Sequence, residues 1–82
     1  MSELLPDPAI VIAHYSDEQS GLHAYVYPLK RGIALCIADV EPDGFVNGVL
    51  ETRIYPHDQR ERAIAAAANF LPAARAEKGP ER

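Results

Sequence analysis

The segment Glu51–Leu71 reads ETRIYPHDQRERAIAAAANFL, and it passes from a strand pattern to a helix pattern within a few residues. Pro56 has no N–H to donate to a sheet ladder, so we expect the strand to end before it. Asp58 is a favourable helix N-cap, and Glu61 follows it at the spacing of a capping box. The segment therefore predicts a strand that stops at Pro56 and a helix over residues 59–71.

The chain before this segment alternates apolar runs with turn residues. Runs rich in β-branched and aromatic residues, bounded by polar or Gly-containing turns, indicate strands. Strands are predicted over residues 9–15, 22–28, 33–40 and 49–55. Because the connections are short, neighbouring strands are expected to be antiparallel. The sequence thus predicts an α+β fold, a four-stranded antiparallel meander sheet followed by one C-terminal helix packed on one face.

The chain of 82 residues predicts a single small domain. We expect an N-terminal arm over 1–8, a folded core over 9–71, and a helix end with a frayed tail over 72–82, where Pro72 either ends the helix or kinks it. A single cysteine, Cys36, excludes an intramolecular disulfide. Because so short a chain buries only a modest core, a partner or a second copy is expected to support its stability.

The predicted helix has one side that suits burial against the sheet. At 100° per residue this side carries Ala63, Ile64, Ala67, Phe70, Leu71 and Ala74. Small alanine side chains on this side allow the helix to approach the sheet closely.

The turns between strands set which side chains share a face of the sheet. A turn over residues 16–21 would place His14 opposite His23. A two-residue turn at Lys30 and Arg31 gathers the bulky aliphatic residues of the second and third strands on one face, whereas a three-residue turn closed by Gly32 exchanges the faces. We favour the two-residue turn, because it puts those aliphatic residues under the helix. The other face then carries Tyr25, Tyr27, Ala34, Cys36 and Ala38.

Charge is spread unevenly along the chain, whose net charge is −4. Residues 1–51 hold eight acidic and two basic residues, and residues 52–82 hold four acidic and six basic residues. The acidic first half favours a basic protein partner over nucleic acid. The alternative is that acidic loops only keep a small protein soluble. The residues predicted to bind a partner are Asp17, Glu18, Tyr25, Tyr27, Asp39, Glu41 and Asp43.

Catalytic and metal-binding patterns are weak in this sequence. His14 and His23 could be cross-strand neighbours within reach of one metal ion, but two histidines alone do not complete a site. Cys36 lies among apolar residues without a nearby base to activate it, so we expect a small buried hydrophobic side chain. Motifs for phosphate loops, nucleophile elbows or zinc proteases are lacking. We therefore expect no enzyme, no cofactor and no metal.

The sequence also bears on localisation. It contains no apolar run long enough to cross a membrane, and its first residues lack the basic and apolar regions of a signal peptide. We expect a cytoplasmic protein that does not contact a membrane.

The order of elements over residues 9–71, with a helix begun by Asp-Gln-Arg-Glu-Arg at 58–62, resembles small phage and mobile-element proteins of the anti-CRISPR inhibitor kind. That resemblance implies a non-enzymatic protein-binding module that covers a basic surface on a larger complex. Two alternatives stay open. One is a structural homodimer joined through open sheet faces or edge strands, and the other is a domain that binds a small ligand or metal through His14 and His23.

Overall fold

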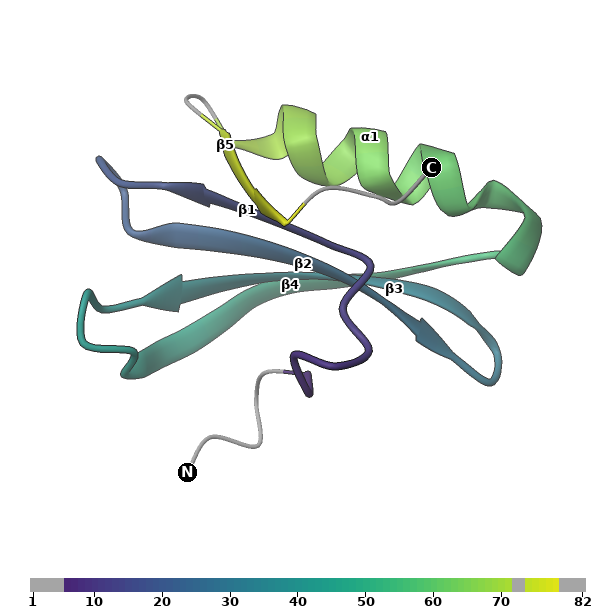
Figure 1. Ribbon diagram of the computed structural model, residues 1–82, viewed down its shortest axis with the longest axis horizontal. Coiled ribbons are helices and arrows are strands. Elements are labelled where there is room, and N and C mark those ends of the chain that lie inside the picture. Colours follow the sequence, from purple (N-terminus) through teal and green to yellow (C-terminus); the bar gives the residue numbers. More distant parts are fainter. Residues whose placement is uncertain (1–5, 72–73, 79–82) are drawn as a thin grey trace.

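The computed structural model describes residues 6–71 and 74–78 and shows an α+β domain with one helix on an antiparallel sheet (Figure 1). The strands are β1 (Ala13–Asp17), β2 (Leu22–Leu29), β3 (Gly32–Val40), β4 (Val46–Tyr55) and β5 (Arg75–Lys78). A short 3₁₀ turn, η1 (His57–Gln59), follows β4 and leads into the helix α1 (Arg60–Phe70). The predicted class, an antiparallel sheet with one C-terminal helix, is confirmed, but the sheet has five strands rather than four.

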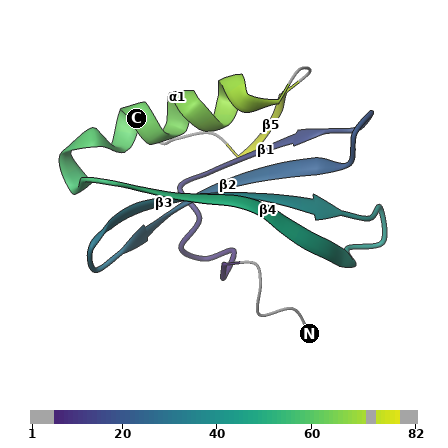
Figure 2. The same ribbon diagram turned by 180° about the vertical axis from the view of Figure 1, so that it is seen from behind.

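The order of strands in the sheet is β4-β3-β2-β1-β5, and all neighbours are antiparallel. The first four strands form the predicted meander. The chain then crosses back over one face of the sheet as α1 and adds β5 beside β1 (Figures 1 and 2). In both views the described part of the N-terminal arm, from residue 6 on, lies on the side of the sheet opposite α1. No helix within the described residues is both long and apolar enough to cross a membrane.

The fifth strand corrects the expectation of a helix end and frayed tail in this part of the chain. Residues 75–78 pair with β1, and all four are exposed. Such a strand has no buried face, so it shows no apolar alternation in the sequence. The predicted fate of Pro72 lies outside the described residues.

The core lies between α1 and the face of the sheet that the two-residue turn predicts. Leu29 pairs with Gly32 across Lys30 and Arg31, which confirms that turn. Its consequence is that the aliphatic residues of β2 and β3 are gathered under the helix. The buried cluster consists of Ala13, Ala24, Val26, Ile33, Leu35, Ile37, Ala63, Ala67 and Leu71. Ala63 and Ala67 have no exposed surface, so the helix backbone lies close to the sheet.

Gly32 is required where β3 starts beside the end of β4. Its φ is 156°, and a Cβ atom added there would collide with the carbonyl oxygen of Tyr55. Glycine is the residue without that atom, so it permits the close approach of the two backbones.

Two local predictions are wrong. The helix N-cap is Gln59, without a side-chain capping hydrogen bond, and Asp58 lies in η1, so the predicted capping box does not form. His14 pairs with Tyr25 rather than with His23, because the β1–β2 connection has four residues instead of six. That shift of two residues leaves the side chains of β1 and β2 on their predicted faces, since side chains in a strand alternate with period two.

Not all residues that were predicted to lie on the buried side of the helix are buried. Ala63, Ala67 and Leu71 are buried, whereas Phe70 is 38% exposed and Ala74 lies beyond the helix. The first strand also begins later than predicted, because residues 9–12 belong to the arm.

Candidate functional site

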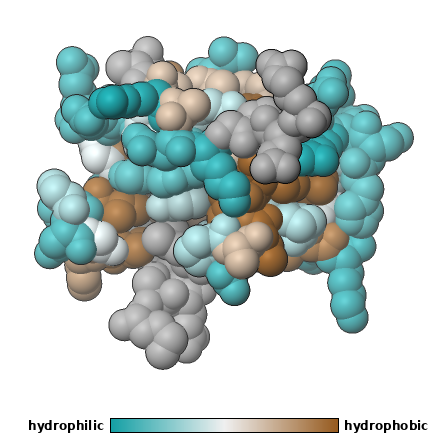
Figure 3. All heavy atoms as spheres, viewed as in Figure 1, coloured by the Kyte–Doolittle hydropathy of each residue, from teal (hydrophilic) through white to brown (hydrophobic). Residues whose placement is uncertain are grey.

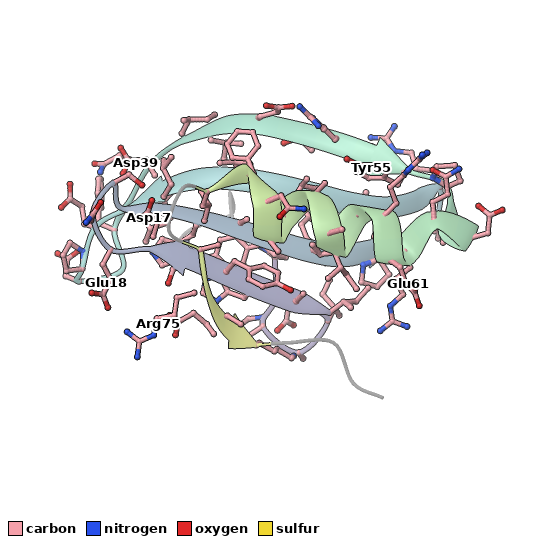
Figure 4. The ribbon with its side chains drawn as sticks, turned by 90° about the horizontal axis from the view of Figure 1, so that it is seen from above. Asp17, Glu18, Asp39, Tyr55, Glu61 and Arg75 are labelled. Carbon is pink, nitrogen blue, oxygen red and sulfur yellow. The ribbon has the colours of Figure 1, made fainter. Side chains whose placement is uncertain are left out.

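The acidic cleft is a hollow of about 690 Å³ at the end of the sheet where the β1–β2 and β3–β4 connections meet. Four of its lining residues carry carboxylates: Asp17, Glu18, Asp39 and Glu41. Antiparallel neighbours put the end of β1 beside the start of β2, and the end of β3 beside the start of β4. The meander therefore brings together acids that are more than twenty positions apart. Figure 4 shows Asp17, Glu18 and Asp39 gathered at one end of the sheet, with Glu61 at the other.

The four carboxylates of the acidic cleft differ in exposure and in hydrogen bonding. Asp17 is only 3% exposed and accepts a hydrogen bond from the backbone N–H of Gln19 at 3.0 Å, so it shapes the turn. Glu18 is exposed and pairs with Arg75 of β5 at 3.2 Å. Glu41 is also exposed and accepts a hydrogen bond from the side-chain amide of Asn47 at 2.8 Å. Glu18 and Glu41 are thus the carboxylates best exposed to a partner.

Asp43, another predicted binding residue, does not line the acidic cleft. It is exposed in the β3–β4 connection and accepts a hydrogen bond from the backbone N–H of Phe45 at 3.0 Å. This bond shapes the turn before β4, so the structure separates Asp43 from the four other predicted acids.

The predicted tyrosines lie on the open face, the face of the sheet opposite α1. Tyr25 pairs with Cys36 and Tyr27 pairs with Ala34, as the two-residue turn predicts. Both tyrosines are half-buried, and Ala34 and Cys36 beneath them are buried. Burial raises the pKa of both tyrosines above its ordinary value, with a smaller contribution from Cys36. They are therefore neutral side chains with an apolar body and a polar tip.

Two histidines join Tyr25 in an aromatic cluster on the open face. The Nε2 atom of His14 lies 2.8 Å from Nδ1 of His23, so one ring donates a hydrogen bond to the other. The ring centroids of His14 and Tyr25 are 4.3 Å apart at an interplanar angle of 12°. The sequence predicts the two histidines as neighbours, and the structure places them diagonally across β1 and β2.

Burial lowers the pKa of both histidines below the ordinary value of 6.5. The charge of His23 lowers the pKa of His14 further, and the carboxylate of Glu77 opposes the shift at both rings. Glu77 itself is held in β5 by the hydroxyl of Ser16, which donates to its Oε2 at 2.7 Å. This hydrogen bond is the main reason that the pKa of Glu77 is lowered. Sequence patterns miss Glu77, because they miss β5.

The arm covers part of the open face next to this cluster. Pro6, Pro8 and Val11 line a smaller hollow of about 270 Å³ together with His14 and Tyr25. Lys78 of β5 also lines this hollow and donates from its Nζ to the carbonyl oxygen of Pro8 at 3.4 Å. The open face is therefore only partly open to solvent.

The described residues offer little for metal binding or nucleophilic chemistry. Across residues 6–71 and 74–78, no three His, Cys, Asp or Glu side chains come together as metal ligands. His14 and His23 could hold an ion together only after their mutual hydrogen bond opens. Cys36 is buried, and this burial raises the pKa of its thiol although a hydrogen bond with Thr52 opposes the shift. A thiol of raised pKa is a weak nucleophile.

The fold and these surfaces define a small α+β domain with an acidic cleft at one end of its sheet. Comparison of the chain with protein-family models, curated proteins and solved structures finds no match.

Proposed function

We propose that this chain is a non-enzymatic protein-binding module whose acidic cleft receives a basic segment of a protein partner. The observation that carries this proposal is the convergence of four carboxylates from two connections on one open cleft. Among the described lining residues of the cleft there is no lysine or arginine. A cleft lined by one sign of charge concentrates the field and attracts segments of the opposite sign.

The rigidity of the cleft supports binding rather than simple solubility. Hydrogen bonds from Gln19 and Asn47 fix Asp17 and Glu41, and the two connections are short. Side chains held in place before binding lose less conformational entropy when a partner arrives. Acids that only keep a protein soluble need no such arrangement.

A basic partner surface would meet this end of the domain first. An inhibitor of the anti-CRISPR kind would act in this way, by covering a basic surface that a larger complex needs for its own ligand. The half-buried tyrosines of the open face would extend the contact, because tyrosine is favoured at protein interfaces.

The experiment is a binding titration in which an oligoarginine peptide serves as a defined basic probe. The double variant Glu18→Lys/Glu41→Lys reverses the two exposed charges of the cleft and leaves the buried Asp17 in place. We expect its affinity to fall at least about tenfold, which is about 1.4 kcal/mol. Affinity of the unchanged chain should also fall as salt is raised.

The matched control is Glu61→Lys/Asp58→Lys, which makes the same charge change at the start of α1, away from the cleft (Figure 4). This control should bind nearly as well as the unchanged chain. A pull-down from the native host with the same three proteins extends the test to the natural partner. Equal capture by all three would overturn the proposal, because binding would not depend on the cleft.

A further inference from the structure

The strand β4 forms a free edge of the sheet. Within the described residues it has β3 on one side and no strand on the other, and α1 lies away from it (Figures 2 and 4). Several large apolar side chains on or next to this strand are exposed: Phe45 at 64%, Val49 at 38%, Leu50 at 57% and Ile54 at 40%. Figure 3 shows the molecule from the side of β1 and β5, where brown hydrophobic surface also lies between the teal hydrophilic side chains. A long, apolar edge strand is a template for pairing with another strand.

The hydrogen-bond alternation of the sheet shows which groups of β4 are free. Val40 donates its N–H to the carbonyl oxygen of Gly21 at 3.0 Å, so even-numbered residues of β3 bond toward β2. In an antiparallel sheet the other residues bond to the opposite neighbour, so odd-numbered residues of β3 bond toward β4. Their partners in β4 are Glu51, Arg53 and Tyr55.

The residues between these partners direct their N–H and C=O groups to the free edge. They are Thr52 and Ile54, and Leu50 is the unpaired residue of the bulge that separates Glu51 from Val49. Thr52 and Ile54 pair with Cys36 and Ala34, so their side chains lie on the open face. The free edge thus combines unpaired backbone groups with exposed apolar side chains.

We propose that β4 pairs with β4 of a second copy of this chain, antiparallel about a two-fold axis at Thr52. In this register Thr52, which bonds outward, faces its own copy, and the exposed side chain of Leu50 faces that of Ile54 of the partner. The partner then satisfies the backbone groups that the edge leaves unpaired. The apolar side chains of Leu50 and Ile54 are buried against each other on the open face.

The charges of β4 fit the same register. Glu51 and Arg53, which pair with each other along the strand within one chain, stand on either side of Thr52. About the two-fold axis Glu51 therefore faces Arg53 of the partner, and Arg53 faces Glu51 of the partner. These positions do not exchange backbone hydrogen bonds across the axis, and side chains in such pairs stand closest together. Acid meets base and apolar meets apolar, which is the self-complementarity that a two-fold interface requires.

The dimer goes beyond the proposed function and does not depend on it. β4 starts near the acidic cleft and runs away from it, so the axis at Thr52 would place the two clefts at opposite ends of one continuous sheet. If both proposals hold, the dimer carries two binding sites for a basic partner and gains avidity from them.

The test measures the mass of the full chain by sedimentation and light scattering up to about 1 mM, where even weak pairing is populated. We expect a mass of twice 9.0 kDa for the unchanged chain. Glu51→Arg and Arg53→Glu each put like charges opposite each other across the axis. Each should raise the dimer dissociation constant at least about tenfold. The double variant Glu51→Arg/Arg53→Glu reverses both partners and should restore the dimer.

The control Glu61→Arg makes the same charge change as Glu51→Arg on α1 and should leave the dimer unchanged. The side chain of Arg53 is 50% exposed and that of Glu51 is 35% exposed, and circular dichroism checks that each variant keeps the fold. A mass of 9.0 kDa at every concentration overturns the proposal. If neither single variant changes the dimer dissociation constant, the interface lies elsewhere and the proposal is wrong. If the double variant stays monomeric, the register about Thr52 is wrong.

Discussion

Two imidazole rings hydrogen bond on the open face, and their protonation is coupled to folding. Burial keeps the pKa of His14 and His23 below the ordinary value of 6.5, so the folded chain prefers neutral rings. The unfolded chain binds protons more readily, so the stabilising effect of the neutral rings is fully present above pH 6.5. It is lost as the pH falls below that value. Glu77 reduces the effect but does not reverse it.

We predict that the free energy of unfolding decreases between about pH 7.5 and about pH 5.5, where ordinary carboxylates stay ionised. Urea denaturation at both pH values measures this decrease. The variant His14→Gln/His23→Gln removes both titrating rings and should lose less stability over the same range.

The third described histidine provides the matched control for this experiment. His57 lies on the surface, with its Nε2 atom 2.8 Å from the carbonyl oxygen of Leu29. His57→Gln makes the same substitution outside the paired rings, so it controls for the effect of the substitution itself on the pH dependence. The interpretation fails if the His57 variant, and not the double variant, loses that dependence.

The helix α1 packs through alanine, and this choice of residue sets its distance from the sheet. Ala67 has no exposed surface, while Ala65 on the other side of the helix is exposed. We predict that Ala67→Leu lowers the free energy of unfolding by about 1–3 kcal/mol, because the larger side chain must displace packed neighbours. Denaturation of Ala65→Leu is the matched comparison and should change stability by less than about 0.5 kcal/mol. Equal effects at both positions would mean that Ala67 does not face the sheet.

The elements differ in how far the sequence predicts them. The β2–β3 hairpin is predicted correctly, because bulky aliphatic residues alternate on both sides of a two-residue turn and only one register buries them together. The β1–β2 register is wrong by two residues, because Ser16 and Asp17 look like turn residues and yet end a strand. Both are buried by tertiary contacts that polar composition does not reveal.

The candidate sites, too, were predicted from the sequence only in part. The sequence places acids in the connections, but their convergence on one cleft follows from the meander and was not predicted. Asp43 is an example. It is an acidic residue in a connection between strands, like Glu18 and Glu41, but it lies outside the cleft. The predicted meander already leaves the fourth strand at an edge of the sheet, but β5, which covers the opposite edge beside β1, was not predicted.

Strand β5 forms one edge of the sheet and contributes no residue to the buried core. The buried cluster lies entirely within residues 13–71, and every residue of β5 is exposed. Strand β5 adds a backbone ladder with β1, the hydrogen bond between Ser16 and Glu77, the hydrogen bond from Lys78 to Pro8, and the exposed ion pair of Arg75. A chain that ends at Leu71 should therefore still fold, but with β1 as an unprotected edge.

We predict that this shortened chain keeps its helix and unfolds cooperatively, with a free energy of unfolding lower by about 1–2 kcal/mol, the net worth of a few hydrogen bonds. Hydrogen exchange should show that β1 loses protection while β3 keeps it, because β3 remains between two neighbours. A chain that ends at Lys78 retains β5 and is the matched control for both measurements. Complete unfolding of the chain that ends at Leu71 would show instead that β5 is needed to hold β1 on the core.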